Sequence, residues 1–224
     1  MAAGSGNGSD NEPTVARARL VLDLRARGLM DADVLKAIEQ TPRIDFVDPA
    51  YAAQAEQDRA LPIACGQTIS EPFIVATMTH ALKLTGREKV LEVGTGSGYQ
   101  TAVLARLCRC VCSVERYRSL MQDAEKRLAA LGLTNVSLMH GDGCLGWEGE
   151  APFDRIIVTA AAREIPETLI GQLGPGGIMI LPVGPDNGVQ RLLRVTIKDD
   201  GALREETLMH VRFVPLVPGK AIFS

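Results

Sequence analysis

Short runs of hydrophobic residues alternate with stretches of helical spacing over most of the chain. The short runs predict strands, and apolar residues three or four positions apart predict helices. Strands that alternate with helices are typical of a mostly parallel sheet covered on both faces. We expect strands over residues 89–93, 110–115, 136–140, 154–158 and 178–182, with helices over 99–107, 118–131 and 165–173.

The pattern differs near the two ends of the chain. Helical spacing over 13–27 and 32–40 predicts a small N-terminal helical extension, with Asp31 placed to cap the second helix. Periodicity is lost over a long connector, 46–70, before helical spacing returns over 72–85. Residues 191–216 predict a β-hairpin with Asp200-Gly201 at its turn, followed by another strand. The fold class is therefore a doubly wound α/β domain with a C-terminal hairpin.

Length and composition favour one domain. We expect a disordered lead over 1–12 and a single domain over 13–224, with the extension and connector in 13–75 and the α/β core in 76–224. The net charge of -3 argues against a nucleic-acid partner. The chain shows neither a membrane-spanning apolar run nor a signal peptide, so we expect a cytoplasmic protein without a membrane partner.

The cysteine pattern "CRCVC" at 108–112 suggests either a metal site or strand residues. Structural zinc sites usually pair two C-x2-C clusters, whereas a spacing of two places all three thiols on one face of a strand. We therefore expect buried, reduced cysteines and no bound metal.

The segment "VLEVGTGSGYQTAVLA" carries the strongest sign of chemistry. Gly94, Gly96 and Gly98 follow a predicted strand and open a predicted helix, where backbone N–H groups can approach a nucleotide-like ligand. A dinucleotide fingerprint would need glycine at position 99, which is tyrosine, and this argues against an NAD-dependent dehydrogenase.

Acidic residues accompany the first three predicted strands of the sheet. Glu92 precedes the glycines, Glu115 ends the second strand and Asp142 follows the third. An acid near position 115 commonly holds ribose hydroxyls. Three acids suit a nucleoside with a cationic tail, which favours S-adenosylmethionine. The alternative is that each glycine makes only a turn and that each acid is a solvated strand end.

The sequence also resembles a known family, the protein-L-isoaspartate O-methyltransferases, over about 13–218. The resemblance is carried by "LPIACGQTISEPFIVATMTHAL", the glycine-loop segment, "FDRIIVTAAAREIPETLIGQLGPGGIMILPVG" and "VRFVPLVPG". It implies a Rossmann-like methyltransferase fold and a protein repair enzyme. Such an enzyme transfers a methyl group from S-adenosyl-L-methionine to the α-carboxylate of L-isoaspartyl residues, leaving S-adenosyl-L-homocysteine. Its partners would be damaged proteins and peptides, and we expect a monomer.

The resemblance also implies roles for individual residues. Ser70 matches the active-site serine and, with the backbone of Val214, would hold the isoaspartyl substrate. The cofactor-binding residues that it implies are Gln67, Thr68, Ile69, Gly94, Gly96, Gly98, Glu115, Asp142 and Gly143. We add Glu92, Arg116 and Thr159 to this set, because they lie at or directly after the ends of predicted strands.

Two alternatives stay open on the acceptor side. Ser70 precedes a Glu-Pro helix start, where serine is a favoured N-cap, and the cap and substrate roles can coexist. Glu71 stands where family members often carry an uncharged residue, and we expect it to face solvent. The rival functions are a methyltransferase of the same fold with another acceptor, and a non-catalytic relative that binds S-adenosylmethionine.

Overall fold

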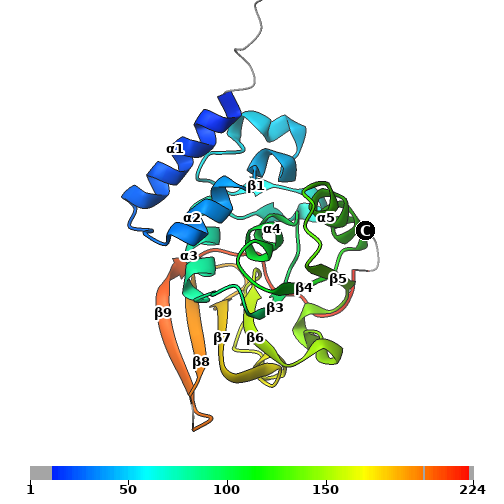
Figure 1. Ribbon diagram of the computed structural model, residues 1–224. Helices are drawn as coiled ribbons and strands as arrows, with labels where there is room; N and C mark the ends of the chain where they lie inside the picture. The colour runs from blue at the N-terminus through cyan, green and yellow to red at the C-terminus, as the bar shows by residue number, and fades with distance from the viewer. Residues whose placement is uncertain (1–11, 199, 222–224) are drawn as a thin grey trace, which may run out of the picture.

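A computed structural model describes residues 12–198 and 200–221 of the chain. The expected disordered lead lies outside the described residues except for Glu12, where the first helix begins. Among the described residues, seven strands form one sheet in the order β5-β4-β3-β6-β7-β8-β9 (Figure 1). The strands are β3 (Lys89–Val93), β4 (Cys110–Glu115), β5 (Val136–His140), β6 (Phe153–Val158), β7 (Leu173–Val183), β8 (Gln190–Ile197) and β9 (Leu203–Val211).

The sheet is mostly parallel, as expected. Every neighbouring pair from β5 to β7 is parallel, and β8 is antiparallel to both β7 and β9. The predicted hairpin is confirmed, with its turn at Asp200-Gly201 between β8 and β9. The parallel order brings the carboxyl ends of β3, β4, β5 and β6 to the same edge, where ligands bind in open α/β sheets.

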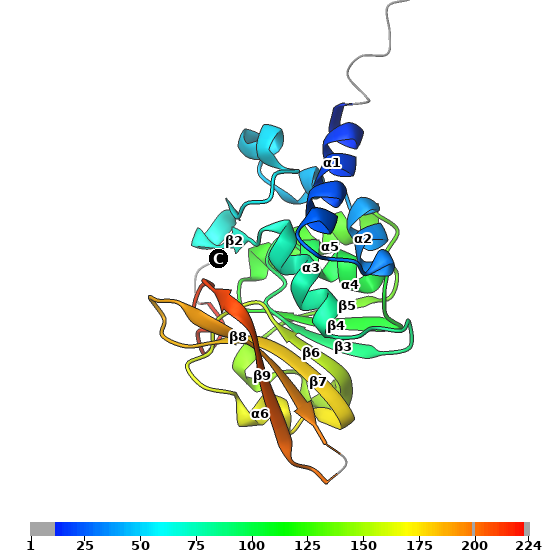
Figure 2. The same cartoon turned by 90° about the vertical axis from the view of Figure 1, so that its left-hand side faces the viewer.

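Helices cover the sheet unequally on its two faces. Figure 2 shows α3, α4 and α5 on one face, with α1 and α2 beyond them, and α6 on the other. The predicted helix over 165–173 is shorter, because Leu173 already pairs with Phe153 of β6 as part of β7. The helices are α1 (Glu12–Ala26), α2 (Ala32–Glu39), α3 (Pro72–Ala81), α4 (Tyr99–Ala105), α5 (Arg118–Ala130) and α6 (Glu167–Ile170).

Alternating strand residues supply the two sides of the core. Val90 packs on the side of α3 and α4, whereas Leu91 packs on the opposite side with Leu169 of α6. Trp147 packs against this second side as well. Burying both faces accounts for the nearly continuous hydrophobic strands of the sequence.

The expectation that three cysteines share one strand face is wrong. Cys108 lies before β4, in the turn after α4, where its N–H donates to the carbonyl of Leu104 at 3.1 Å. Cys108 and Cys112 pack on opposite sides of the sheet. All five cysteines are free thiols, and the described residues contain no cluster of three potential metal ligands.

The connector contains regular elements that the periodicity does not reveal. They are the 3-10 helices η1 (Arg43–Phe46), η2 (Pro49–Gln54) and η3 (Ala64–Gly66) and the strands β1 (Leu61–Pro62) and β2 (Thr68–Ile69). The two strands pair antiparallel, with Leu61 opposite Ile69. Elements of two to six residues are too short to show a period, so the sequence reads as irregular there. Two further 3-10 helices, η4 (Gly143–Leu145) and η5 (Glu148–Glu150), follow β5.

The prediction of an additional strand after the hairpin is also wrong. The segment that follows β9 forms only an isolated bridge, in which Ala161 pairs with Pro215. Pro215 and Pro218 have no backbone N–H to donate to a ladder. The segment instead lies across the carboxyl ends of the strands and contributes to the site described below.

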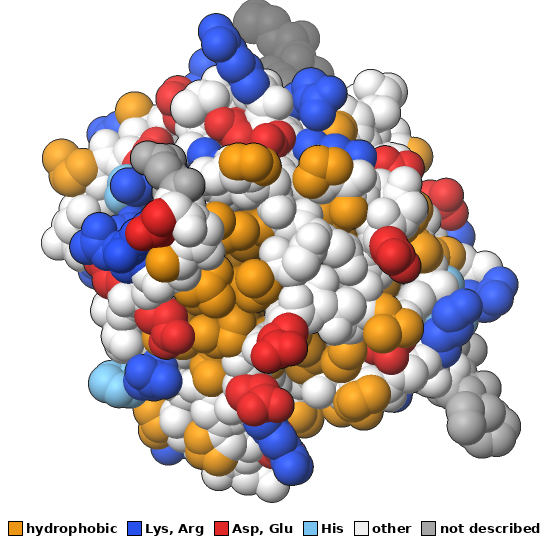
Figure 3. Space-filling model, turned by 90° about the horizontal axis from the view of Figure 1, so that it is seen from below, with side chains coloured by type: hydrophobic (Ala, Val, Ile, Leu, Met, Phe, Trp, Pro, Cys, Tyr) orange, Lys and Arg blue, Asp and Glu red, His pale blue; other side chains and the backbone are white. Residues whose placement is uncertain are grey.

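The face seen from below in Figure 3 carries both hydrophobic and charged side chains. Viewed from below, hydrophobic side chains gather near the middle of the face beside acidic ones, and basic side chains lie mainly toward the rim (Figure 3). None of the helices in the described ranges has the length and apolar character needed to cross a membrane.

Candidate functional site

Three adjoining cavities lie at the carboxyl edge of the sheet, and Thr68 and Thr159 line all of them. The strand-end cavity is lined also by Gly94, Gly96, Glu115, Arg116 and Gly143. The connector cavity is lined also by Ser70, Glu71, His210, Arg212 and Val214. The loop cavity is lined also by Ile69, Ser70, Gly96, Ser97 and Tyr99.

The glycine loop is held against the end of β6 by Thr159. The Thr159 hydroxyl lies 2.7 Å from the carbonyl oxygen of Gly94 and 3.0 Å from that of Val93. Gly94 has φ +96°, and a Cβ there would lie 2.3 Å from Thr159 Oγ1. Glycine is therefore required at this position by both its backbone conformation and the close approach of the hydroxyl.

Glu115 fixes the other side of the strand-end cavity. Its Oε2 accepts the N–H of Gly96 at 2.8 Å, and its Oε1 accepts the N–H of Tyr117 at 3.0 Å. Each carboxylate oxygen can accept a further hydrogen bond. The carboxylate therefore remains able to bind a pair of hydroxyl groups, as a ribose presents.

The walls of the strand-end cavity also fit an adenosyl group. Val93, Val114 and Leu216 offer apolar surface beside the acceptor oxygens of Glu115. Mostly apolar walls with few well-placed polar groups are typical of cofactor sites. The residues present thus suit S-adenosylmethionine, with Glu115 at the ribose and the apolar walls at the base.

Three members of the predicted cofactor set lie outside the cavity linings. Gly98 packs against α5, where a Cβ would lie 3.1 Å from the Cβ of Ala124. Glu92 is fully buried beneath the loop, and its Oε2 accepts from the hydroxyls of Thr101 at 2.5 Å and Ser113 at 2.6 Å. Burial, opposed by these hydrogen bonds, raises the pKa of Glu92 to about 8.

Asp142 is the third residue outside the linings, although its neighbour Gly143 lies within one. Asp142 Oδ1 accepts the N–H of Cys144 at 2.9 Å, and Oδ2 accepts the N–H of Gly219 at 2.7 Å. The carboxylate thus fastens the C-terminal segment over the cavity. A Cβ on Gly143 would lie 2.5 Å from Val93 Cγ1, so glycine allows the close packing of this turn on β3.

The short β1–β2 hairpin positions the residues between the cavities. Thr68 pairs with Pro62 and is an exposed residue that lines all three cavities. Ile69 is buried and lines the loop cavity. Gln67 lines the strand-end cavity, and its amide donates to the carbonyl of Cys65 at 3.1 Å. The structure thus places these three predicted residues in the linings of adjoining cavities.

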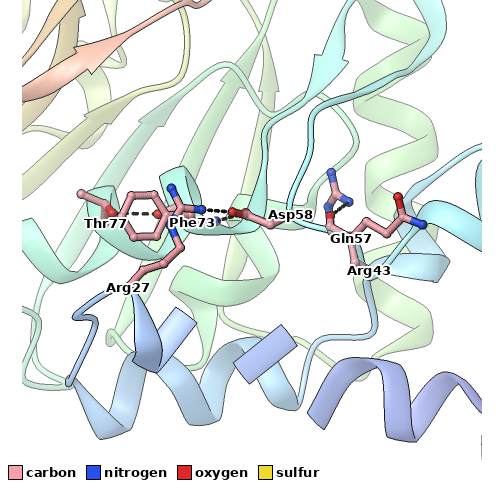
Figure 4. A network of polar contacts seen from close by, with 6 residues as sticks. All are labelled: Arg27, Arg43, Gln57, Asp58, Phe73 and Thr77. Atoms are coloured by element: carbon pink, nitrogen blue, oxygen red, sulfur yellow. Dashed lines mark hydrogen bonds and ion pairs between the residues drawn. The ribbon is translucent and has the colours of Figure 1, made fainter. Parts of the chain in front are cut away.

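Ser70 lines both the connector and loop cavities, and its hydroxyl makes no hydrogen bond to any residue within the described ranges. The expected N-cap role is not observed. The N-cap position of α3 is Glu71, whose side chain makes no capping bond. Asp58 caps the helix instead, since its Oδ1 accepts the N–H of Phe73 at 2.8 Å (Figure 4). The serine hydroxyl is therefore available for a ligand.

The expectation that Glu71 faces solvent is wrong. Its side chain is half-buried and lines the connector cavity. Burial, reinforced by the nearby Asp58 carboxylate, raises the pKa of Glu71, while Arg27 and Arg43 oppose the shift. Arg27 forms an ion pair with Asp58 and stacks over Phe73 with 3.5 Å between guanidinium carbon and ring centroid (Figure 4).

Val214 lines both the strand-end cavity and the connector cavity. Its carbonyl accepts the N–H of Ala161 at 2.8 Å, and the carbonyl of Ala161 accepts the N–H of Leu216 at 2.8 Å. These bonds fix the backbone of Val214, while its own N–H has no partner among residues 12–198 and 200–221. A fixed, unpaired N–H suits recognition of a carboxylate.

Several lining residues escaped the sequence analysis. Tyr117 follows Glu115 and Arg116 at the end of β4, and Ala160 follows Thr159. Their positions directly after predicted strands could have indicated them. His210 of the connector cavity lies near the end of β9, and no local motif marks it. Arg212 directly follows β9 within "VRFVPLVPG", a segment that carries the family resemblance but in which only Val214 was assigned a role.

The chain is similar to one family of known proteins. The chain matches the family model for protein-L-isoaspartate(D-aspartate) O-methyltransferase over residues 15–221. The protein-L-isoaspartate O-methyltransferase of Rhodospirillum rubrum is 54% identical over 204 residues, which cover 91% of this chain and 93% of the relative. That of Xanthobacter autotrophicus is 52% identical over 221 residues, which cover 99% of each.

Solved structures give the same result. A protein-L-isoaspartate O-methyltransferase superposes with a TM-score of 0.80 at 30% identity over 89% of this chain, which spans 65% of that solved chain. A Plasmodium falciparum relative in complex with S-adenosyl-L-homocysteine gives 0.78 at 26% identity, covering 90% of this chain and 98% of its own. The resemblance seen in the sequence is confirmed, and the chain belongs to the protein-L-isoaspartate(D-aspartate) O-methyltransferase family of S-adenosylmethionine-dependent enzymes.

Proposed function

We propose that this chain performs the family reaction where its three cavities meet, with cofactor in the strand-end cavity and isoaspartyl peptide in the connector cavity. The reaction transfers a methyl group to the free α-carboxylate of L-isoaspartyl residues in damaged proteins and peptides. The observation that carries this proposal is the shared lining, because Thr68 and Thr159 border both cavities. A methyl donor in one cavity and an acceptor in the other then meet at the same place.

On the cofactor side, the backbone of Gly94 and Gly96, with Arg116 and Thr159, would surround the ligand, and the Glu115 carboxylate would accept hydrogen bonds from the ribose. The side chains of Glu92 and Asp142 would support the site without contact. When bound, S-adenosylmethionine supplies a methyl group activated by the adjacent positive sulfur.

On the acceptor side, the Ser70 hydroxyl and the Val214 N–H would donate hydrogen bonds to the substrate carboxylate. A carboxylate with a pKa of about 4 is already ionised at neutral pH and needs no general base. The two donors therefore have to hold it so that one oxygen is in line with the methyl group. The resulting methyl ester re-forms a succinimide without further catalysis, and hydrolysis of the succinimide returns some normal aspartate.

Because the substrates would be damaged sites in many different proteins, we expect an open acceptor site. The connector cavity is bounded by the connector on one side and by the end of β9 on the other. Recognition through the isoaspartyl geometry and the main chain requires little contact with flanking side chains. A single-domain monomer in the cytoplasm remains the accompanying prediction from the sequence.

The test uses two matched peptides, one with L-isoaspartate and one with ordinary aspartate. Transfer of labelled methyl from S-adenosylmethionine is followed for the wild type and for Ser70→Ala. We expect base-labile methyl ester on the isoaspartyl peptide alone, with formation slowed at least about 10-fold in the variant. Equal methylation of both peptides, or none of either with cofactor bound, would reject the proposal and favour another acceptor or a non-catalytic role.

A further inference from the structure

Arg43 is a fully buried cation that contacts the backbone of Ser70. Its side chain is 0% exposed, although it belongs to a 3-10 helix 27 positions before the serine. Arg43 Nη2 donates to the carbonyl oxygen of Ser70 at 3.1 Å and to that of Arg59 at 2.8 Å. One guanidinium thus ties the serine to the middle of the connector.

The other terminal nitrogen of Arg43 extends the same anchorage. Nη1 donates to the carbonyl of Ala55 at 2.6 Å. It also donates to the carbonyl of Gln57 at 3.4 Å (Figure 4). The acceptors of the guanidinium are four main-chain carbonyls, three of them within residues 55–59 and the fourth at Ser70. A planar fork of donors holds such a set in one geometry, which a lysine ammonium would not.

Arg43 also lies next to the cofactor side. Its guanidinium carbon is 5.9 Å from the ring centroid of Tyr99, the first residue of α4 after the glycine loop. Tyr99 lines the loop cavity together with Ser70 and Gly96. Arg43 is therefore packed between the segment that carries the serine and the helix that follows the cofactor loop.

Burial of this charge needs an explanation beyond packing. A buried cation is tolerated only when hydrogen bonds compensate for lost hydration, and an apolar side chain would often fill such a site at less cost. The four carbonyl bonds supply that compensation at the two terminal nitrogens, while Nε has no hydrogen-bond partner among the described residues. The bond to the Ser70 carbonyl also fixes where residue 70 lies. The serine side chain itself has no bond to a described residue that could hold it.

We infer that Arg43 is a positioning residue, which holds the Ser70 backbone so that the serine hydroxyl meets the acceptor carboxylate. This inference rests on the proposed role of Ser70 in methyl transfer. Arg43 does not line any of the three cavities, so it acts through Ser70 rather than on substrate or cofactor.

The main test compares Arg43→Lys with Leu24→Ala, a core variant in α1 whose apolar side chain makes no hydrogen bond to Ser70. Leu24 is 0% exposed, so its truncation lowers Tm by loss of packing alone. We expect Arg43→Lys to lower kcat for an isoaspartyl peptide at least about 10-fold, with the Kd for S-adenosyl-L-homocysteine changed less than about 3-fold. Leu24→Ala should leave kcat near that of the wild type.

A double-mutant cycle with Ser70→Ala separates positioning from a general structural role. If Arg43 acts through the serine hydroxyl, Arg43→Lys lowers kcat by less than about 2-fold once that hydroxyl is removed. The inference is overturned if Arg43→Lys costs the same factor in both backgrounds, or if Leu24→Ala lowers kcat equally.

Chemical rescue provides a second readout if Arg43→Lys fails to fold. In Arg43→Ala, added guanidinium ion at millimolar concentration should raise kcat at least about 3-fold, whereas ammonium ion should not, because only the planar fork reaches several carbonyls. Equal effects of the two cations would contradict the inference. Wild-type protein that does not methylate the isoaspartyl peptide would instead contradict the proposed function, so the two failures are distinguishable.

Discussion

The two sides of the site are held in place by different means. The cofactor side is built from strand ends of one sheet, and Gly94, Gly96 and Glu115 are fixed by hydrogen bonds among neighbouring turns. The acceptor side comes from the connector, where the buried side chain of Arg43 and the partly exposed side chain of Asp58 hold the backbone around Ser70. The comparison indicates that the strand ends of the sheet form the proposed cofactor site and that the connector forms the proposed acceptor site.

The largest effect on cofactor binding is expected from Gly94→Ala. Its Cβ would lie 2.3 Å from Thr159 Oγ1 in a backbone with φ +96°. We expect S-adenosyl-L-homocysteine affinity to fall about 100-fold or more, because the loop and Thr159 must move apart. Isothermal titration calorimetry measures this loss.

Gly86→Ala is the matched control for that experiment. Gly86 has φ +87°, but no atom lies within 4 Å of a Cβ placed there. The control should lose stability from backbone strain alone and keep its cofactor affinity. A similar loss of affinity in both variants would show that strain, rather than the contact with Thr159, explains the result.

The next effect is expected from Glu115→Gln, which perturbs the same side more mildly. One carboxylate oxygen becomes an NH2 group facing the N–H of Gly96 or Tyr117. An unpaired buried donor costs about 1–3 kcal/mol, so cofactor affinity should fall roughly 10- to 100-fold. Peptide KM, measured at saturating cofactor, should stay within about 2-fold of the wild type. A change in peptide KM alone would refute this division of roles.

Glu92→Gln changes how the free energy of unfolding depends on pH, because it replaces the buried carboxyl beneath the cofactor loop. The pKa of Glu92 is raised from 4.5 to about 8 in the folded protein, so protonation favours folding. Its stabilising contribution is complete below about pH 4.5 and is lost as pH rises toward 8. Urea unfolding should show the wild type losing on the order of a few kcal/mol more than Glu92→Gln between pH 5 and 8. Parallel pH profiles for the two proteins would contradict the buried, protonated carboxyl.

The smallest effect is expected from Glu71→Gln on the acceptor side. Removing a half-buried carboxylate beside Ser70 relieves repulsion of the substrate carboxylate. We expect KM for the isoaspartyl peptide to fall about 2- to 3-fold, with less change at high salt because salt screens the repulsion between charges that water still reaches in part. Glu164→Gln, an exposed acid outside the connector cavity, is the control and should leave KM unchanged.

The same comparison explains what the sequence could predict. The strand-then-glycine pattern and Glu115 depend on residues close together along the chain, so the cofactor side was predicted in outline. Glu92 and Asp142 look alike in sequence as acids beside strand ends, yet both side chains bond to protein groups instead of lining the cavity. Which way such an acid points depends on packing that a local pattern does not contain.

The acceptor side was harder to predict because its contacts are distant in sequence. Asp58 caps α3 from 15 residues away, and Arg43 reaches Ser70 across 27. The 3-10 helices and two-residue strands between them are too short for a hydrophobic period. Ser70 and Val214 were identified through the family resemblance, whereas the Ser-Glu-Pro pattern alone favoured a cap that the structure does not contain.

If acceptor positioning and cofactor binding are separable, Ser70→Ala will impair only the first. Calorimetric affinity for S-adenosyl-L-homocysteine and the rate of isoaspartyl methylation are measured on the same preparation. We expect affinity within about 2-fold of the wild type and methylation at least about 10-fold slower. A variant that loses affinity and rate together, or that keeps the wild-type rate, would contradict this separation.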